Sequence, residues 1–231
     1  MRNRRGQGET LSLFQPEEAK REIAPGAFLL RGFALELESA LLAGVDEVRG
    51  ASGFRNMVTP GGYRMSVAMT NCGDLGWITD RTGYRYDSVD PENGKKWPEM
   101  PAAFRRLAES AARASGFADF HPNACLINRY EAGTKLSLHQ DKDERDFTQP
   151  IVSVSLGIPA TFLFGGLARS DKAERIPLRH GDVVVWGGPA RLRYHGVAEL
   201  KAGEHPQLGC VRVNLTFRKV ALEAARGLEA R

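Results

Sequence analysis

Eight short runs of strand-forming residues in the second half of the chain restrict the possible folds most strongly. β-branched, leucine and aromatic residues are common in these runs, and turn-forming residues separate them. The runs lie at 125–130, 136–140, 151–156, 161–164, 176–179, 182–186, 192–195 and 211–217. Eight strands with turns between them are typical of a jelly roll, in which two sheets face each other. The sequence therefore predicts a mainly β fold with a jelly-roll core at about 120–218.

The first half of the chain has mixed patterns. Apolar residues recur at helical spacing over about 34–49 and 101–115, which predicts two flanking helices on the outside of one sheet. The stretch 52–90 contains many Gly, Thr, Arg and aromatic residues and several turn signals, which favours hairpins and loops. We expect one domain at 24–218, a flexible N-terminal tail at 1–23 and a C-terminal tail at 219–231.

The composition is that of an ordinary globular protein. Of 231 residues, 42% are hydrophobic and 26% are charged, which excludes collagen-like, coiled-coil and disordered chains. No apolar run reaches the roughly 18 residues of a membrane helix, and no signal-peptide pattern is visible. The scattered cysteines Cys72, Cys125 and Cys210 favour a reducing compartment. We therefore expect a soluble cytoplasmic protein, taken to be a monomer, whose net charge of +4 permits a nucleic-acid partner.

One histidine–aspartate pair has the spacing of metal ligands on a strand. His139 and Asp141 are two residues apart, so an extended chain presents both side chains on one face. His195, at the end of another predicted strand, is the candidate third ligand. Two histidines and one carboxylate form the facial triad of non-haem Fe(II) oxygenases. A second pair, His180 and Asp182, is interpreted as a turn in which the aspartate accepts backbone N–H bonds.

The last strand run has a polar face that suits a diacid. Arg212, Asn214 and Arg218 alternate with apolar residues, and a guanidinium binds a carboxylate through two parallel hydrogen bonds. Asn128 and Tyr130 give a similar polar face on an earlier strand. The alternative is a half-buried strand with a hydrated outer face, which is the common arrangement in antiparallel sheets.

Aromatic and basic residues alternate in the middle region. They are Tyr63, Trp77, Tyr84 and Tyr86, with Arg64, Arg81 and Arg85 among them. Proteins use such mixtures to stack on bases and to pair with phosphates, which indicates a nucleic-acid contact. The alternative is a small apolar cluster beneath long loops.

Seven segments of the chain resemble one known family in order and spacing. They are MVTPGGYRMSVAMTNCG (57–73), CLINRY (125–130), KLSLHQDKDE (135–144), PIVSVSLG (150–157), FGGL (164–167), HGDVVVWGG (180–188) and RVNLTFR (212–218). Together they resemble the AlkB family of Fe(II)/2-oxoglutarate-dependent DNA repair dioxygenases over about 24–218. The resemblance implies a double-stranded β-helix, which is a form of jelly roll, with a nucleotide-recognition lid before it at about 52–90.

The resemblance also implies roles for the residues that bind iron and the cosubstrate. The implied Fe(II) ligands are His139, Asp141 and His195. The groups implied to hold the distal carboxylate of 2-oxoglutarate are Tyr130, Arg212 and Asn214, and those near its metal-chelating end are Asn128 and Arg218.

Further residues are implied to contact the substrate. They are Trp77, which stacks on a flipped base, Tyr84, Arg85 and Tyr86 in the lid, Asp143 near an exocyclic amine, and Arg169. From the residues alone, Asp143 has an alternative as an exposed loop residue paired with Lys142 or Arg145.

The implied activity is oxidative demethylation of N-alkylated bases such as 1-methyladenine and 3-methylcytosine. It consumes 2-oxoglutarate and O2 at Fe(II) and releases formaldehyde, succinate and CO2. The expected partner is alkylated single- or double-stranded DNA, with RNA as a further candidate. The alternatives are a 2-oxoglutarate-dependent hydroxylase of RNA or protein, and a non-catalytic nucleic-acid-binding jelly roll.

Overall fold

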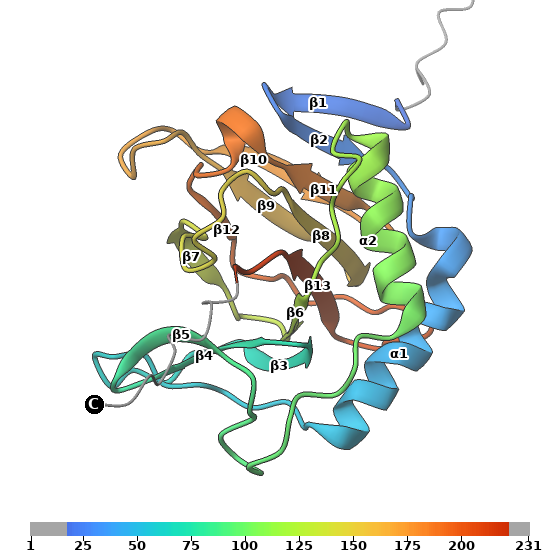
Figure 1. Cartoon of the computed structure of the whole chain (residues 1–231). Coiled ribbons are helices and arrows are strands. Elements are labelled where there is room, and N and C mark those ends of the chain that lie inside the picture. Colours follow the sequence, from blue (N-terminus) through green and yellow to red (C-terminus); the bar gives the residue numbers. More distant parts are fainter. Residues whose placement is uncertain (1–17, 222–231) are drawn as a thin grey trace, which may run out of the picture.

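Two facing antiparallel sheets form the centre of the protein. The computed structural model describes residues 18–221, and the N-terminal arginines and the last ten residues lie outside this range. The larger sheet has seven strands in the order β1-β2-β11-β8-β13-β6-β3, and the smaller has four in the order β10-β9-β12-β7 (Figure 1). Apolar residues of both sheets, including Trp186 of the larger and Phe162 of the smaller, share one buried cluster. The fold is therefore the expected jelly roll.

The strands of the larger sheet come from both halves of the chain. Their bounds are Lys20–Ala24 (β1), Ala27–Leu30 (β2), Ala68–Gly73 (β3), Ala124–Tyr130 (β6), Ile151–Gly157 (β8), Val183–Trp186 (β11) and Arg212–Arg218 (β13).

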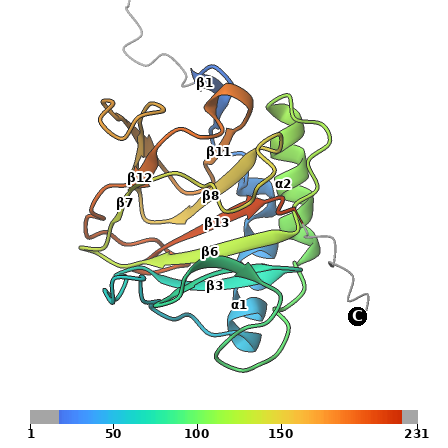
Figure 2. The same cartoon turned by 60° about the vertical axis from the view of Figure 1, so that its left-hand side comes forward.

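The smaller sheet and a separate hairpin lie on the other side of the larger sheet from the helices. The strands of the smaller sheet are Leu136–His139 (β7), Ala160–Phe164 (β9), Glu174–Leu178 (β10) and His195–Val197 (β12). Within residues 18–221, Gly76–Asp80 (β4) and Gly83–Asp87 (β5) pair with each other and with no other strand. This hairpin, called the lid hairpin below, lies beside β3 and β6 (Figure 2).

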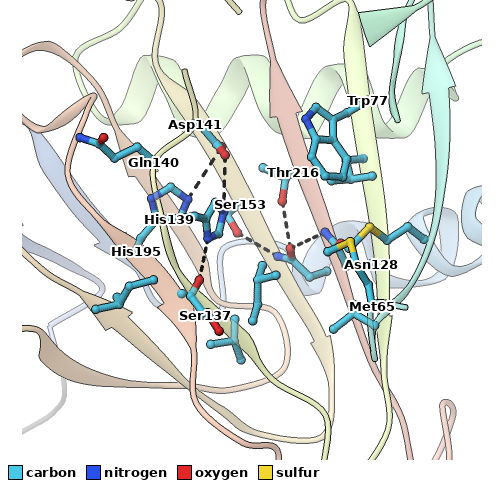
Figure 3. A pocket seen from close by; sticks show the side chains of 18 of the residues that line it. Met65, Trp77, Asn128, Ser137, His139, Gln140, Asp141, Ser153, His195 and Thr216 are labelled. Carbon is cyan, nitrogen blue, oxygen red and sulfur yellow. Dashed lines mark hydrogen bonds and ion pairs between the residues drawn. The ribbon is translucent and has the colours of Figure 1, made fainter. Parts of the chain in front are cut away.

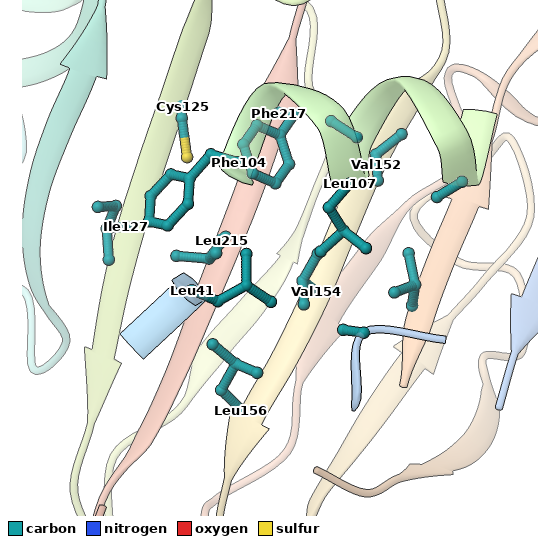
Figure 4. Close-up of a cluster of buried hydrophobic side chains, with 14 of the residues drawn as sticks. Leu41, Phe104, Leu107, Cys125, Ile127, Val152, Val154, Leu156, Leu215 and Phe217 are labelled. Atoms are coloured by element: carbon teal, nitrogen blue, oxygen red, sulfur yellow. The ribbon is translucent and has the colours of Figure 1, made fainter. Parts of the chain in front are cut away.

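Two helices cover the outer face of the larger sheet. They are α1 (Glu38–Ala51), which follows a 3-10 turn at Leu35–Leu37, and α2 (Ala102–Ala114). Neither is long and apolar enough to cross a membrane, and the same holds for every helix among residues 18–221. Leu41 of α1 and Phe104 of α2 pack against Leu215 and Phe217 of β13 (Figure 4). The apolar residues of β13 thus face the helices, and its polar residues face the smaller sheet.

The structure differs from the sequence prediction at three strands. Lys20–Ala24 lies mostly in the predicted tail but pairs with β2 as an edge strand. Ala68–Gly73 lies in the predicted lid but is the opposite edge of the larger sheet. The seventh predicted strand, 192–195, was misplaced, since β12 begins at His195. A 3-10 turn at Gly188–Ala190 continues into a turn that the Arg193 N–H closes by donating to the carbonyl of Ala190, and this turn prevents an earlier start.

Replacing Phe104 by alanine is expected to lower the free energy of unfolding by about 3–5 kcal/mol. The ring is fully buried and makes an edge-to-face contact with Phe217 at 6.0 Å between centroids. Urea denaturation measures the loss. Leu167→Ala is the control, because Leu167 is 62% exposed and should change stability by less than about 0.5 kcal/mol. Equal losses in the two variants would contradict this packing.

Candidate active site

A cavity of about 520 Å³ lies between the two sheets. Its walls come from β6, β8 and β13 of the larger sheet, from β7 and β12 of the smaller sheet, and from the lid hairpin. Most of the residues predicted to bind iron, cosubstrate or substrate line it (Figure 3). Residues from opposite ends of the sequence therefore meet in one place.

His139, Asp141 and His195 form a compact group at one end of the cavity. Strand pairing places His139 directly opposite His195 across β7 and β12, and Asp141 follows β7 after two residues. Nε2 of His139 is 3.6 Å from Oδ1 of Asp141, and Nε2 of His195 is 3.8 Å from Oδ2 (Figure 3). All three ligand atoms lie within 4.8 Å of one another, which suits a single metal ion.

Backbone contacts fix both imidazoles in the form that binds metal. Nδ1 of His139 is 2.9 Å from the carbonyl oxygen of Ser137, and Nδ1 of His195 is 3.0 Å from that of Arg193. Because a carbonyl oxygen only accepts, each Nδ1 carries the proton and each Nε2 presents a lone pair. Burial lowers the pKa of His195 to about 3, with His139 acting in the same direction, so His195 is neutral at physiological pH.

Asp141 is held in its charged form. Burial by itself raises the pKa of the carboxyl, but the charge of Arg218 and the two imidazoles bring it below its ordinary value. Nε and Nη2 of Arg218 both bond Oδ2, at 2.8 and 2.6 Å. Oδ1 remains directed toward His139. Two imidazole nitrogens and one carboxylate oxygen fit Fe(II) with positions left open.

Glu38, His180 and His205 form a second cluster whose ligand atoms lie within 4.8 Å of one another, but His180 presents no lone pair to it. The Gly157 N–H donates to Nδ1 of His180 at 2.9 Å, so a neutral His180 carries its proton on Nε2 and offers no lone pair there. Asp182 accepts from the backbone N–H groups of Gly32 and Arg179, as the turn interpretation predicted.

Arg212 is a buried cation with an unused donor. Its side chain is 1% exposed, Nε bonds Ser155 Oγ at 3.0 Å, and the guanidinium lies 4.8 Å from the ring centre of Tyr130. Within residues 18–221, nothing accepts a hydrogen bond from its Nη1, and Oδ1 of Asn128 also lacks a partner. Burial lowers the pKa of Arg212, and Tyr130 partly opposes this shift. An anion with several oxygens, such as a carboxylate, would complete this pocket.

Two other predicted cosubstrate residues have protein partners in this structure. The side-chain amide of Asn214 donates to Ser153 Oγ and to the carbonyl of Val154, both at 2.8 Å. Arg218 was expected near the metal-chelating end of 2-oxoglutarate, and here it binds Asp141. Both residues still line the cavity.

Two aromatic rings of the lid hairpin line the cavity. Trp77 of β4 stacks on Tyr84 of β5 at 5.7 Å between centroids and 19° between planes. Trp77 Nε1 donates to Asp143 Oδ2 at 3.0 Å, and Arg169 lines the same cavity. The chain is not extended as far as Asp143, since β7 ends at His139, and Asp143 is exposed as its alternative predicted. Its carboxylate nevertheless faces the cavity.

Arg85 and Tyr86, which were also expected to contact the substrate, do not line the cavity. Strand alternation places Arg85 on the face opposite Tyr84, where it pairs with Asp80 at 2.9 Å. Tyr86 shares the face of Tyr84 but lies about 7 Å further along the strand. Its hydroxyl donates to Glu144 at 2.6 Å.

Sequence reasoning missed two buried charges near the candidate iron ligands. Glu144 and Arg191 are 1% and 2% exposed, and they form an ion pair at 3.0 Å. Glu144 belongs to the charged run 141–146, which is indistinguishable from a solvated surface loop in sequence. Arg191 lies in the connection between the strands predicted at 182–186 and 192–195, and no sequence pattern marks it as a buried charge.

Comparisons with known proteins agree with this geometry. The 2OG-Fe(II) oxygenase superfamily matches residues 26–218. "Alpha-ketoglutarate-dependent dioxygenase AlkB" of Salmonella typhimurium is 59% identical over 212 residues, which cover 91% of this chain and 98% of that protein. "DNA N(6)-methyladenine demethylase ALKBH1C" of Arabidopsis thaliana is 33% identical over 63% of this chain and 38% of its own length. The solved structure of OsALKBH1 has a TM-score of 0.75 and 30% identity, covering 87% of this chain and 99% of that one.

Substituting His139 by alanine is expected to abolish Mn(II) binding, because the ion loses one of its three protein ligands. His180→Ala should keep the affinity within about threefold of the unmodified protein and lower stability only, since His180 Nε2 is protonated. Titration calorimetry with Mn(II) on metal-free protein measures both. If His180→Ala loses the metal while His139→Ala retains it, the wrong histidine–aspartate pair was chosen.

Proposed function

Since the chain belongs to the 2OG-Fe(II) oxygenase superfamily and, within it, to the AlkB family of dioxygenases, we propose that it demethylates N-alkylated bases in DNA. The enzyme class is that of the family, an Fe(II)- and 2-oxoglutarate-dependent dioxygenase. The substrate is the proposed part. The observation that carries it is the stacked pair of Trp77 and Tyr84, with the Asp143 carboxylate beside it, over the cavity that holds His139, Asp141 and His195.

The bound cofactors determine which reaction occurs, and the residues of the protein determine where in the cavity it occurs. When bound, Fe(II) and 2-oxoglutarate supply oxidising chemistry in which O2 gives succinate, CO2 and a hydroxylated N-methyl carbon that leaves as formaldehyde. The ligand set is proposed to be His139, Asp141 and His195. Arg212 and Tyr130 are proposed to hold the distal carboxylate, where a buried donor lacks a partner.

The lid residues account for a base as the substrate. A methyl group on a ring nitrogen is inaccessible inside a duplex, so the base must leave the stack. Trp77 offers a flat apolar surface for such a base, and stacking on one aromatic ring is worth about 1–3 kcal/mol. 1-Methyladenine and 3-methylcytosine are cationic and carry an exocyclic amine, and Asp143 offers a carboxylate to both features.

Further parts of the proposal concern partners and place. DNA is proposed as the principal partner because a similar protein, ALKBH1C of Arabidopsis thaliana, is by its name a demethylase of a DNA base. RNA is the other candidate. We further propose that the protein acts as a monomer in the cytoplasm, and size-exclusion chromatography with light scattering tests the first of these statements.

The deciding experiment measures succinate and formaldehyde from oligonucleotides that carry 1-methyladenine, 3-methylcytosine or unmodified bases. Formation that requires iron, 2-oxoglutarate and a methylated base supports the proposal. Matched DNA and RNA strands, and an N-methylated peptide, separate the alternative substrates. Succinate that a methylated base does not increase would contradict demethylation, and absence of any turnover would favour a non-catalytic binding protein.

Arg212→Ala is expected to weaken 2-oxoglutarate binding by about 2–5 kcal/mol, since a buried carboxylate loses its cation. This loss is roughly 30- to several-thousand-fold in affinity. Arg212→Lys should recover only part of it, because an ammonium group cannot form the two parallel bonds. Calorimetry with 2-oxoglutarate and Mn(II) measures the change. Unchanged affinity in Arg212→Ala would contradict the assignment.

Asp143→Ala is expected to lower kcat/KM on 1-methyladenine by roughly 10- to 150-fold, the kinetic equivalent of one charge-assisted hydrogen bond. Neutral N-alkylated bases should lose less, and Mn(II) affinity should stay unchanged. Asp146→Ala is the matched control, because Asp146 belongs to the same loop and does not line the cavity. Equal losses on cationic and neutral bases would show that Asp143 orients the base without sensing its charge.

A further inference from the structure

Glu144 connects the iron-binding end of the cavity to the lid through four polar contacts. Its Oε2 accepts from Nη2 of Arg191 at 3.0 Å. Its Oε1 accepts from the hydroxyl of Tyr86 at 2.6 Å and lies 3.4 Å from Nε of Arg218. Its backbone carbonyl accepts from the N–H of Ala221 at 3.1 Å. A carboxylate that is 1% exposed with all these partners is fixed in position.

The two arginines that hold Glu144 also hold Asp141. Arg218 bonds Oδ2 of Asp141 through two nitrogens, and Nη1 of Arg191 donates to the backbone carbonyl of Asp141 at 2.7 Å. The side chain and the backbone of Asp141 are therefore both oriented by guanidinium groups, and each of these groups is balanced by Glu144. Two buried cations meet two buried anions, which removes most of the cost of burying them.

The lid contacts the loop after Asp141 through two consecutive residues. Trp77 of β4 bonds Asp143, and Tyr86 of β5 bonds Glu144. The first bond lies in the cavity, where a bound base competes for it. The second bond is outside the cavity, so it persists when the base is present.

We infer that Glu144 is a positioning residue for the iron site, which sets Asp141 through Arg218 and Arg191 and couples the lid to Asp141 through Tyr86. The inference rests on the proposed ligand set and goes beyond it, because neither Glu144 nor Tyr86 touches the metal. Glu144 also places a negative charge near the metal position, which offsets the cations around Asp141 and favours binding of a divalent ion.

Glu144→Gln tests the positioning role. Arg191 and Arg218 then keep their charges but lose one anion, so Arg218 competes more strongly with the metal for Asp141. Mn(II) affinity is expected to fall by about 10- to 100-fold, as for other residues that orient metal ligands. Binding of 2-oxoglutarate, which is proposed to use Arg212, gives a second readout. The factor by which Mn(II) raises the affinity of the protein for 2-oxoglutarate should fall in Glu144→Gln.

Tyr86→Phe tests the positioning role if Glu144→Gln is too unstable to purify. It removes one hydrogen bond to a buried carboxylate and should lower Mn(II) affinity by about 2- to 10-fold. Tyr63→Phe makes the same chemical change at a lid residue that is 78% exposed, and it should leave the affinity unchanged. The positioning role is overturned if Glu144→Gln binds Mn(II) with the same affinity as Tyr63→Phe. If Glu144→Gln does not fold, the same comparison is made with Tyr86→Phe.

Hydrogen exchange tests the coupling to the lid without any substrate. If the lid and the metal site are coupled, Mn(II) must affect the lid as much as the lid affects Mn(II). Mn(II) is therefore expected to slow amide exchange in Gly83–Asp87 of the unmodified protein and of Tyr63→Phe, and to have no such effect in Tyr86→Phe. An amide exchange rate in β5 that is the same with and without Mn(II) in the unmodified protein overturns the coupling. Failure of demethylation alone would leave both results intact and would contradict only the proposed substrate.

Discussion

The buried polar face of β13 is the constraint on which the rest of the structure depends. Arg212 and Arg218 project from one face of this strand into the space between the sheets, where an unpaired charge costs several kcal/mol. Arg218 is neutralised by Asp141 and Glu144. Among the residues that the structure describes, Arg212 has only neutral partners and an unused donor. The protein thus places one fully paired cation beside the candidate metal ligands and one incompletely paired cation elsewhere in the same cavity.

The packing of the opposite face of β13 offsets the free-energy cost of burying these charges. Val213, Leu215 and Phe217 pack against the two helices in a buried apolar cluster, so stability comes from one side of the strand and chemistry from the other. The same division applies to β8, where Val152 and Val154 face the helices and Ser153 and Ser155 serve Asn214 and Arg212. Because apolar core residues and polar site residues alternate along single strands, the packing of the core also holds the polar side chains in place.

The regular patterns were the predictable part of this protein. Alternation along β13 and the spacing of His139 and Asp141 both indicated groups that the structure brings into one cavity. The hydrated-face alternative for β13 was wrong, because sequence alternation distinguishes two faces without showing what covers each one. The positions of Arg85, Tyr86, Glu144 and Arg191 depend on tertiary packing. A strand pattern gives the face of a residue but not the neighbour at that point, and a run of charges gives no sign that one of them is buried.

Under the proposed function, the bond between Trp77 and Asp143 would make the entry of a base into the cavity selective. In the structure the indole N–H already donates to the carboxylate, and an incoming base would have to replace this hydrogen bond. Under the same proposal, a base with neither a positive charge nor a suitable donor would be a poorer partner for Asp143 than the indole, and it would be disfavoured without any steric clash. A cationic base would give Asp143 a stronger partner than the indole. Discrimination between bases would then begin with the exchange of this hydrogen bond, before any group on the base reaches the candidate metal ligands.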